Sequence, residues 1–402
     1  MRKSLVAAAV IGAVAASGAI AYRVLAPAET LTPASGAYPA PSASVPGVLG
    51  SIGAAPLIVD GRLRVYATTR QVRADGPVDA RTQRTPYWSY RRWPEQLLGV
   101  VATAGVVVSR WSDGELVALD ARTGRVAWRS LARPPEGAGY DGGSTGAATV
   151  YAPAGLHTGA PGRVLMRDPG GLRAIDAATG RELWRTSLEN CLVDGFTTRD
   201  GWYAATDTCT SQWGLALYDP ASGQRTRWAA PVAGATPAVE TVGCGVARSG
   251  CAGMRTGGNG ATRGWVFERA QPVATPALDT TDSTVTGDVV VAARDGVMVG
   301  LSRDGTEMWR WRGNANNTNS AELLTTQSGA VHLLTDDRQL VTLDPATGHE
   351  RSRFVLAYGR ERTKWVPGHV AAADGYVVVE RMVPPAGSDD YFSVAPVILA
   401  RT

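Results

Sequence analysis

Lysine is almost absent from this chain of 402 residues and occurs only as Lys3 and Lys364. Arginine therefore carries nearly all the positive charge. Arginine suits bidentate binding of anions, although a GC-rich coding sequence that replaces lysine codons is the simpler explanation. The net charge is +4, of which Arg2 and Lys3 supply two. The remaining excess is too small for a general nucleic-acid surface, so we expect no nucleic-acid partner.

Cysteine and histidine are also scarce, with four residues of each. No two cysteines are adjacent, and neither residue type shows the paired spacing of a zinc site. We therefore expect no metal. Convincing helical periodicity is missing after residue 56, which leaves a chain that is nearly all β.

The first 22 residues form a targeting segment. Met1-Arg2-Lys3 precedes residues 4–22, which carry no charge and are mostly Ala, Val, Ile and Gly. This pattern indicates either a signal peptide, cleaved after Ala19-Ile20-Ala21, or a single transmembrane anchor. The absence of a following cysteine excludes a lipoprotein anchor. Both alternatives place residues 23–402 outside the cytoplasm. Residues 23–55 are rich in Pro, Ala and Ser and predict a linker.

An eleven-residue unit returns along the chain. Ala118-x-Asp120-x-x-x-Gly124-Arg-x-x-Trp128 is followed by Ala174-x-Asp176-x-x-x-Gly180-Arg-x-x-Trp184. Each copy predicts two strands joined by a turn, in which the Asp accepts turn amides and the Gly supplies a positive φ. The Trp offers a large apolar face to the neighbouring unit. Looser copies run from Asp219 to Trp228 and from Asp344 to Phe354.

The aromatic residues that end these strands set the period of the repeat. They lie 39 to 56 residues apart, at Trp88, Trp128, Trp184, Trp228, Phe267, Trp309 and Phe354. Four strands in such a period are typical of a propeller blade. Residues 132–146, rich in Gly and Pro, form an insertion in the longest interval.

Ring closure decides the number of blades. Beyond Phe354 the chain offers three strands, at 368–373, 376–382 and 392–400. Pairing them with the outer strand that ends near Trp88 would complete a blade and hide two sheet edges. We therefore predict an all-β, seven-bladed propeller within residues 56–402. An extra strand at 63–69 leaves eight blades as the alternative.

The repeated unit resembles the tryptophan-docking motif of the pyrroloquinoline-quinone (PQQ) type β-propellers, over roughly residues 85–400. The chain looks like an exported or membrane-anchored, actinobacterial member. The resemblance implies a propeller and is not specific for the cofactor. Dehydrogenases of this superfamily are longer, and they place adjacent cysteines, a carboxylate, an Asn and Ca²⁺ at the quinone. No such set stands out here, so we expect no cofactor.

An even cysteine count in an exported chain suggests disulfides. Cys191 and Cys209 are equidistant from Asp200, so a hairpin centred there would bring them face to face. Cys244 and Cys251 would then close a short loop. Four buried free thiols are the alternative.

Three other segments were candidates for function. Residues 142–146 match Gly-x-Ser-x-Gly, but this hydrolase motif needs a strand-to-helix elbow, and we expect no helix there. Residues 314–320 are a polar link between blades. Strand packing is the simpler explanation of a possible binding surface that comprises Trp88, Tyr90, Arg91, Arg92 and Trp93.

These observations predict an exported, monomeric propeller that performs no catalysis. We expect it to bind a cell-envelope protein or ligand, and it also resembles the propeller lipoproteins that scaffold the insertion of outer-membrane proteins. The alternatives are a PQQ-dependent or other enzyme that works at the channel mouth, and a ligand-sensing ectodomain.

Overall fold

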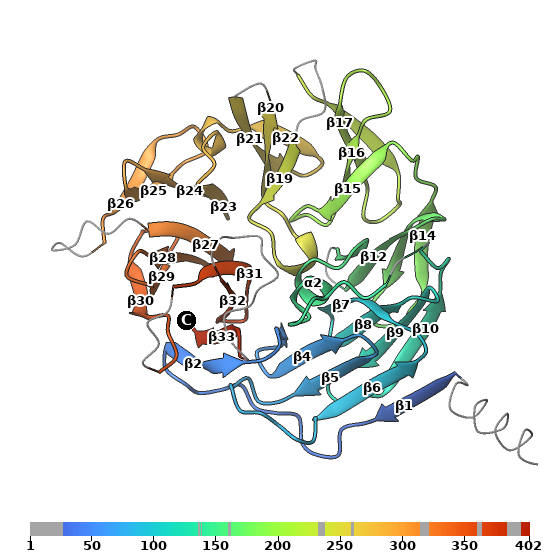
Figure 1. The fold of residues 1–402 in the computed structure, drawn as a ribbon. Helices are drawn as coiled ribbons and strands as arrows, with labels where there is room; N and C mark the ends of the chain where they lie inside the picture. Colours follow the sequence, from blue (N-terminus) through green and yellow to red (C-terminus); the bar gives the residue numbers. More distant parts are fainter. Residues whose placement is uncertain are drawn as a thin grey trace, which may run out of the picture.

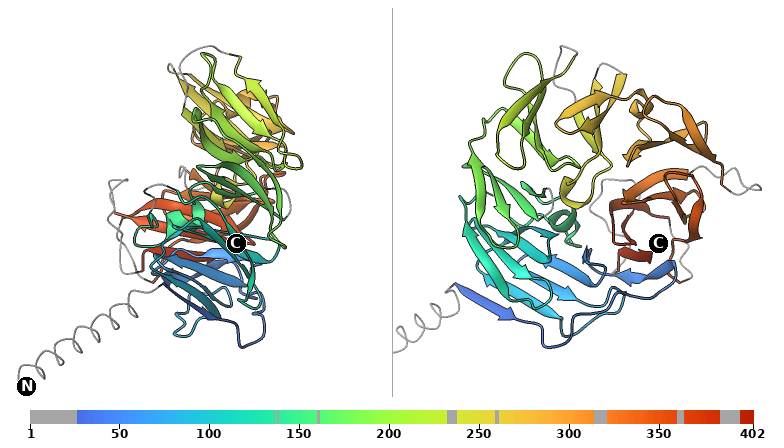
Figure 2. Two further views of the ribbon diagram at one scale, coloured as in Figure 1. Left: turned by 90° about the vertical axis from the view of Figure 1, so that its right-hand side faces the viewer. Right: turned by 180° about the vertical axis from the view of Figure 1, so that it is seen from behind.

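Eight antiparallel sheets follow one another around a ring in the computed structural model, and the view from behind shows the same circular order (Figures 1 and 2). The chain is therefore an eight-bladed β-propeller. The residues that the structure describes are 27–135, 137, 139–159, 162–231, 238–258, 261–313, 321–359, 364–383 and 395–402.

Each blade has its first strand nearest the centre of the ring and its fourth on the rim (Figure 1). Blade 1 comprises β3 (Leu57–Val59), β4 (Leu63–Thr68), β5 (Gln71–Asp75) and β6 (Trp88–Trp93), with β1 (Ala28–Thr32) added outside β6. Blade 2 comprises β7 (Leu97–Thr103), β8 (Val106–Trp111), β9 (Glu115–Asp120) and β10 (Val126–Leu131). Blade 3 comprises β11 (Leu156–Thr158), β12 (Arg163–Asp168), β13 (Gly171–Asp176) and β14 (Glu182–Thr186). Blade 4 comprises β15 (Leu192–Thr197), β16 (Tyr203–Asp207), β17 (Gly214–Tyr218) and β18 (Arg225–Ala229).

The second half of the ring repeats this plan. Blade 5 comprises β19 (Ala238–Val242), β20 (Gly253–Gly258), β21 (Ala261–Glu268) and β22 (Gln271–Ala274). Blade 6 comprises β23 (Ser283–Thr286), β24 (Val289–Arg294), β25 (Val297–Leu301) and β26 (Glu307–Trp311). Blade 7 comprises β27 (Ala321–Gln327), β28 (Ala330–Thr335), β29 (Gln339–Leu343) and β30 (Glu350–Val355). Blade 8 comprises β31 (Val366–Ala373), β32 (Tyr376–Met382), β33 (Val397–Arg401) and β2 (Gly47–Ile52). Short helices are α2 (Ala147–Tyr151), η1 (Val246–Arg248) and η2 (Pro276–Leu278).

The prediction of seven blades was wrong, and the alternative of eight holds. Trp88 does not lie on the closing blade, because β3, β4 and β5 precede it and build a complete blade of their own. The ring is closed instead by β2, which pairs antiparallel with β33 through Val48 and Ala400. Phe267 also proved to be a false marker, since it lies on the third strand of blade 5 and not on the outer one.

Two segments of the predicted linker at residues 23–55 are strands of the ring. β1 pairs with β6 over its whole length, and β2 completes blade 8. Between these strands Tyr38 donates a hydrogen bond to Asp60 at 2.7 Å. A composition rich in Pro, Ala and Ser does not prevent pairing at a sheet edge, because an edge strand needs only one hydrogen-bonded side.

The targeting segment at residues 1–22 lies outside the described residues. Among the residues that are described, no helix has the length and apolar character needed to cross a membrane.

The repeated unit forms the turn between the third and fourth strands. In blade 2 the carboxylate of Asp120 accepts the amide and the hydroxyl of Thr123, both at 2.8 Å, and the amide of Gly124 donates to the Asp120 carbonyl. Blade 3 repeats this geometry with Asp176, and hydrogen bonds from Thr179 lower the pKa of that carboxyl. Asp219 and Asp344 head the same turn in blades 4 and 7, followed by Gly223 and Gly348.

A tryptophan on the outer strand of one blade is seated on this turn in the next blade. The indole Nε1 atoms of Trp88, Trp128, Trp184 and Trp309 donate to the carbonyl oxygens of Ala121, Ala177, Pro220 and Pro345 at 2.7 to 3.0 Å. The turn glycine makes room for the ring: at Gly124 (φ 65°) a Cβ would lie only 2.3 Å from the Cβ of Trp88. Ala118 and Ala174, on the strands that precede the turns, are fully buried.

Other contacts seal the remaining blade interfaces. Trp228 packs edge-on against Trp265 of blade 5, with ring centroids 5.0 Å apart. Phe354 packs against the apolar cluster that joins blades 7 and 8. At the closure a larger cluster includes Val378 and Leu399 from blade 8 and Val65 from blade 1. The ring is therefore continuous although the indole contact is not repeated at every interface.

Replacing Gly180 by Ala should destabilise the ring more than replacing Gly305. Both glycines have positive φ (74° and 89°), so the backbone cost of each alanine is similar, about 1 kcal/mol. A Cβ at position 180 would lie 2.6 Å from the Trp128 ring, whereas one at 305 would have nothing within 4 Å. Overpacking adds about 1–3 kcal/mol at position 180 only. Urea denaturation measures both losses, and equal losses would contradict the seating of Trp128 on this turn.

Candidate functional site at the centre of the ring

α2 lies at the middle of the ring, inside the first strands of the blades (Figure 1). It comes from the long connection between β10 and β11 and touches β4, β7, β31 and η1. Ala147, Val150 and Tyr151 are buried and belong to the cluster that seals the closure. A helix of five residues is not stable alone, so the surrounding blades hold it in place.

Hydrogen bonds fix this central plug, which we define as residues 142–151. The hydroxyl of Thr145 donates to the carboxylate of Glu380 on β32, and the Thr145 carbonyl accepts the amide of Ala55 at 2.8 Å. Tyr151 donates to the carbonyl of Pro56 at 2.7 Å. The plug is thus bonded to blades 1 and 8 by side chains that are themselves buried.

Glu380 is a buried carboxylate with several donors. His369 donates from its backbone amide and from Nδ1, at 3.2 and 3.0 Å. Burial raises the pKa of Glu380, but the bonds from His369 and Thr145 outweigh it and hold that pKa below its ordinary value. The side chain is therefore ionised at neutral pH and charge-assists the bond that holds the plug.

The expectation that no helix follows the Gly-x-Ser-x-Gly match was wrong, since α2 begins directly after Gly146. The residues before the helix form a turn and not a strand. In the described part of the chain, no hydrogen bond joins Ser144 to a histidine. The geometry of a nucleophile elbow is therefore not present.

A disulfide-closed loop meets the plug from the opposite side of the ring. Cys244 and Cys251 are bonded, and the loop between them carries η1. The carbonyl of Ala247 accepts Nδ1 of His157 at 2.7 Å, and Ser249 accepts the amide of Thr158 at 2.9 Å. Burial lowers the pKa of His157 to about 4, so the neutral imidazole makes this bond at neutral pH. The loop is thereby pinned to β11.

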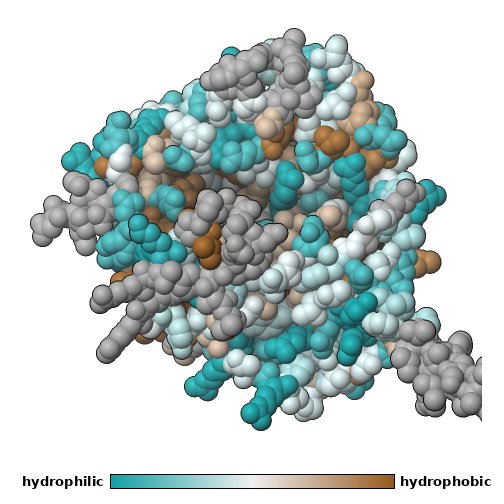
Figure 3. All heavy atoms as spheres, in the orientation of Figure 1, coloured by the Kyte–Doolittle hydropathy of each residue, from teal (hydrophilic) through white to brown (hydrophobic). Residues whose placement is uncertain are grey.

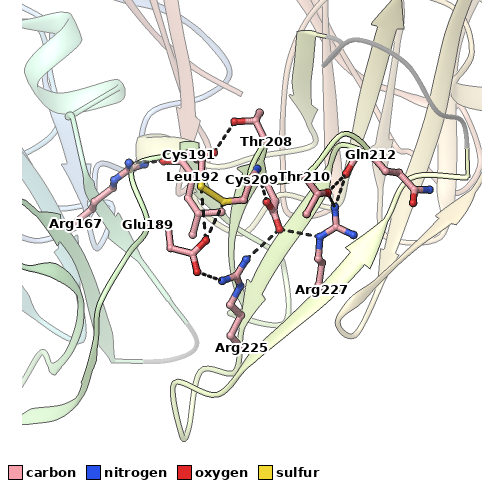
Figure 4. The surroundings of a disulfide bond; sticks show 11 residues. Arg167, Glu189, Cys191, Leu192, Thr208, Cys209, Thr210, Gln212, Arg225 and Arg227 are labelled. Carbon is pink, nitrogen blue, oxygen red and sulfur yellow. Dashed lines mark hydrogen bonds and ion pairs between the residues drawn. A yellow bond between two sulfur atoms is a disulfide. The ribbon is translucent and has the colours of Figure 1, made fainter.

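The second disulfide, Cys191–Cys209, lies at the end of the β15–β16 hairpin (Figure 4). The predicted pairing of the four cysteines is confirmed. Asp207 beside it binds Arg225 and Arg227 at 3.0 and 2.9 Å. Burial raises the pKa of Asp207, but hydrogen bonds from the Cys209 amide and from Arg227 keep it below its ordinary value. Bonded sulfurs are not thiolate ligands, so their proximity to Glu189 does not make a metal site.

The axis retains one polar cavity of about 390 Å³ beside Tyr151. Its walls are first and second strands of blades 5 to 7 and the disulfide-closed loop. Arg255 and Glu240 are paired there at 2.5 Å, and Arg255 also donates to Ser283. Threonine hydroxyls and a satisfied ion pair can bind a polar group, but within the described residues they do not form a nucleophile–base–orienter set.

The residues around the axis do not fit the quinone site of the related dehydrogenases. That site needs adjacent cysteines, and all four cysteines here are bonded in blades 4 and 5. Asn190, the only asparagine among the described residues, precedes the disulfide-bonded Cys191 in the connection between β14 and β15. Tyr151 and the plug occupy the middle of the ring instead.

The aromatic and arginine segment at β6 is mostly internal. Trp88 is seated on blade 2, and Tyr90 is buried with its hydroxyl bonded to Arg129 at 3.2 Å. Arg92 binds Asp113 through two hydrogen bonds, and Trp93 lies beneath Arg70 at 4.2 Å. Arg91 alone of the five is exposed. The proposed binding surface is therefore not displayed as a set. Residues 314–320 lie outside the described residues.

Glu380→Gln should lower the unfolding free energy at neutral pH by about 1–3 kcal/mol, because the plug loses its ionised acceptor. The melting temperature should fall accordingly. The folded-state pKa of Glu380 is depressed, so this stabilisation is present above the ordinary carboxyl pKa of about 4. It is lost as the pH falls through the folded-state value. The difference between wild type and variant should therefore shrink in acid.

The matched control is Glu307→Gln. The carboxylate of Glu307 is exposed and accepts a hydrogen bond from Arg310 on its own strand. It should change the melting temperature little at any pH, because exposed pairs contribute little. If the melting temperatures of wild type and E380Q differ by the same amount at pH 7 and at pH 3, the assigned role of the Glu380 carboxylate is contradicted.

Comparison with known proteins places the chain in a family. A family model described as the outer membrane protein assembly factor BamB matches residues 9–242 and 112–382. Two curated relatives are dehydrogenase subunits of quinone alcohol dehydrogenases, from Gluconacetobacter polyoxogenes and Komagataeibacter europaeus. Each is 32% identical over 148 residues, covering 32% of this chain and 19%, about a fifth, of the relative.

Solved structures that resemble the chain are distant in sequence. BamB from Moraxella catarrhalis is 15% identical with a TM-score of 0.45, covering 89% of this chain and 99% of that one. The C-terminal WD40 domain of Sif2 is 12% identical with a TM-score of 0.48, covering 89% and 97%. The family model matches well over half of the residues of this chain. The chain therefore belongs to the PQQ-type β-propeller family, whose model is described as the outer membrane protein assembly factor BamB.

Proposed function

We propose that the chain is an extracytoplasmic, non-catalytic β-propeller that binds a cell-envelope protein or ligand. The observation that carries this proposal is the chain's own plug at the centre of the ring, together with the lack of a catalytic set around the polar cavity beside it, among the described residues. Thr145 and Tyr151 bond the plug to blades 1 and 8, and the disulfide-closed loop meets it from blade 5. Chemistry on the axis needs a catalytic set as well as space, and the described residues around the axial cavity form no nucleophile–base–orienter set. Binding on a face or on the rim does not need such a set.

Two further features support an exported binding module. Disulfides persist mainly in oxidising compartments, so the two bonds agree with the signal or anchor expected at residues 1–22. Membership of a family described by an outer-membrane assembly factor favours a scaffold, although the partner here need not be the same.

The surface has the mixed character of a reversible protein interface. On the face shown in Figure 3, apolar residues lie in separate small groups among polar ones. Exposed apolar side chains include Leu131, Met308 and Val355, which are 74%, 53% and 57% exposed on outer strands of blades 2, 6 and 7. Non-obligate interfaces are about as apolar as ordinary surface, so the rim meets this requirement.

Photocrosslinking tests the binding function directly. A photoreactive phenylalanine analogue at Leu131, Met308 or Val355, in the full chain in its native envelope, should yield a discrete product from at least one position. Excess untagged protein should suppress that product. Failure at all three positions, or a diffuse ladder that untagged protein does not compete, would count against a rim-bound partner.

The similarity to quinone alcohol dehydrogenases favours an enzyme as the second candidate. Adding PQQ and Ca²⁺ to the purified chain should give neither a retained chromophore nor a higher melting temperature, because the plug fills the axis and the cysteines are bonded. A chromophore that survives desalting and stabilises the protein would overturn the non-catalytic proposal.

A further inference from the structure

A cavity of about 420 Å³ lies off the axis, between blade 2 and the connection that carries α2. Leu98 of β7, Ala148 of α2 and Pro153 form apolar parts of its wall. Its polar lining comprises Arg110 of β8, Thr149 of α2, and Tyr140 and the acidic Asp141 from the connection before α2. The volume is within the range of small-molecule sites, which combine apolar walls with a few polar groups.

Arg110 is the unusual member of this wall, because its guanidinium is buried and, among the described residues, has no carboxylate within ion-pair distance; Asp168 acts on it only from farther away. The residue is only 4% exposed. Its Nη1 donates to the carbonyl of Ala154 at 3.0 Å, and its Nε has no partner among the described residues. No ion pair of Arg110 occurs in the described part of the chain.

Other buried arginines of the chain show what Arg110 lacks. Arg64 is equally buried and binds Asp79 at 3.0 Å. Arg173 lies 3.7 Å from Asp168, whose carboxylate also accepts the amide of Gly170 at 2.6 Å. Removing a charge from water is costly unless a counter-charge and hydrogen bonds replace the solvent. All three arginines have an Nε without a hydrogen-bond partner among the described residues. Arg64 and Arg173 each have a carboxylate within 4.0 Å, whereas Arg110 has one carbonyl acceptor and only the more distant charge of Asp168.

Thr149 adds a second unsatisfied group to the same cavity. The residue is 2% exposed, and its hydroxyl has no partner among the described residues. A threonine hydroxyl donates one hydrogen bond and accepts others. Buried polar atoms of this kind are normally satisfied. Arg110 and Thr149 therefore place two residues with unsatisfied polar atoms around one cavity.

We propose that this cavity binds a small amphipathic oxyanion. The anionic head, a carboxylate or a phosphate monoester, bonds Arg110 and Thr149, since a guanidinium fork matches the paired oxygens of either group. The apolar body of the ligand packs against Leu98, Ala148 and Pro153. This site is independent of the rim that the proposed partner would use, so either can fail without the other.

Calorimetry on the purified full chain tests the site with three probes of equal chain length: octanoate, octyl phosphate and octanol. At least one anion should bind and raise the melting temperature, and the two anions distinguish the carboxylate from the phosphate. Octanol should bind at least tenfold more weakly, because it lacks the charge that Arg110 requires. Equal affinity for octanol, or no binding of either anion, would overturn the proposal.

Three variants locate the binding. R110Q should weaken the anion at least tenfold and remove the preference over octanol, and the near-isosteric T149V should weaken it a few-fold. L98W fills the cavity and should block all binding without touching either polar group. The control is R122Q, which removes an exposed arginine in the blade 2 turn and should bind as wild type.

Circular dichroism shows whether each variant folds. If R110Q does not fold, T149V and L98W carry the test. Wild-type affinity in a folded R110Q, or in both T149V and L98W, would show that the anion binds elsewhere and would overturn the assignment.

Discussion

The ring depends on the seating of an indole over a residue that has no side chain. Trp128 occupies the space that a Cβ at Gly180 would need, and its Nε1 donates to Ala177 beside that glycine. The contact has two parts, each encoded by a few neighbouring residues. The outer strand of one blade provides the indole, and the turn that begins with Asp in the next blade provides the glycine and the carbonyl that accepts the indole Nε1. A sheet that carries both halves can therefore join identical neighbours on either side, which is the requirement for a repeating ring.

Where one half of this contact is missing, the chain substitutes a different seal. Gly305 in the shortened turn of blade 6 receives no ring, and blade 5 has no aromatic residue on its outer strand. Trp228 packs on Trp265 instead, and the closure is sealed by apolar residues of blades 8, 1 and 2 together with α2. The plug thus belongs to the stabilising core as well as to the centre of the ring, which explains why its hydrogen bonds extend to both sides of the closure.

The sequence predicts what is local and misses what depends on distant pairing. The turns headed by Asp120 and Asp176 carry their own hydrogen bonds, so the repeat, the all-β class and the propeller architecture could be predicted. Blade 1 was missed because β5 and β6 are joined by residues 76–87 without the Asp-x-x-x-Gly turn. β2 was missed because its partner, β33, lies some three hundred and fifty residues away, and nothing in a Pro- and Ala-rich segment announces that pairing. α2 has too few residues for a periodic pattern, and its burial depends on contacts with four distant elements.

The candidate sites were harder to predict for the same reason. The equal spacing of Cys191 and Cys209 from Asp200 predicted their disulfide, because pairing within one hairpin depends on local sequence. The aromatic segment at β6 was predicted as a possible binding surface because composition cannot distinguish an exposed aromatic ring from a buried one. Trp88 is buried against the turn of blade 2. No sequence pattern marks Arg110 as a candidate, because its surroundings come from β7, α2 and the segment after α2.

A filled axis changes where a propeller of this kind can act. In this chain a carboxylate, Glu380, is buried on β32, the second strand of blade 8, and accepts hydrogen bonds from His369 and from Thr145 of the plug. Its hydrogen bonds are used to hold the chain's own segment, so they are not available to an axial ligand unless the plug leaves. Departure would expose Ala147, Val150 and Tyr151 and break the apolar cluster across the closure. Removing the plug is therefore coupled to loosening the ring. A function that leaves the plug in place has the rim, the faces, the off-axis cavity and the polar cavity beside Tyr151 available to it.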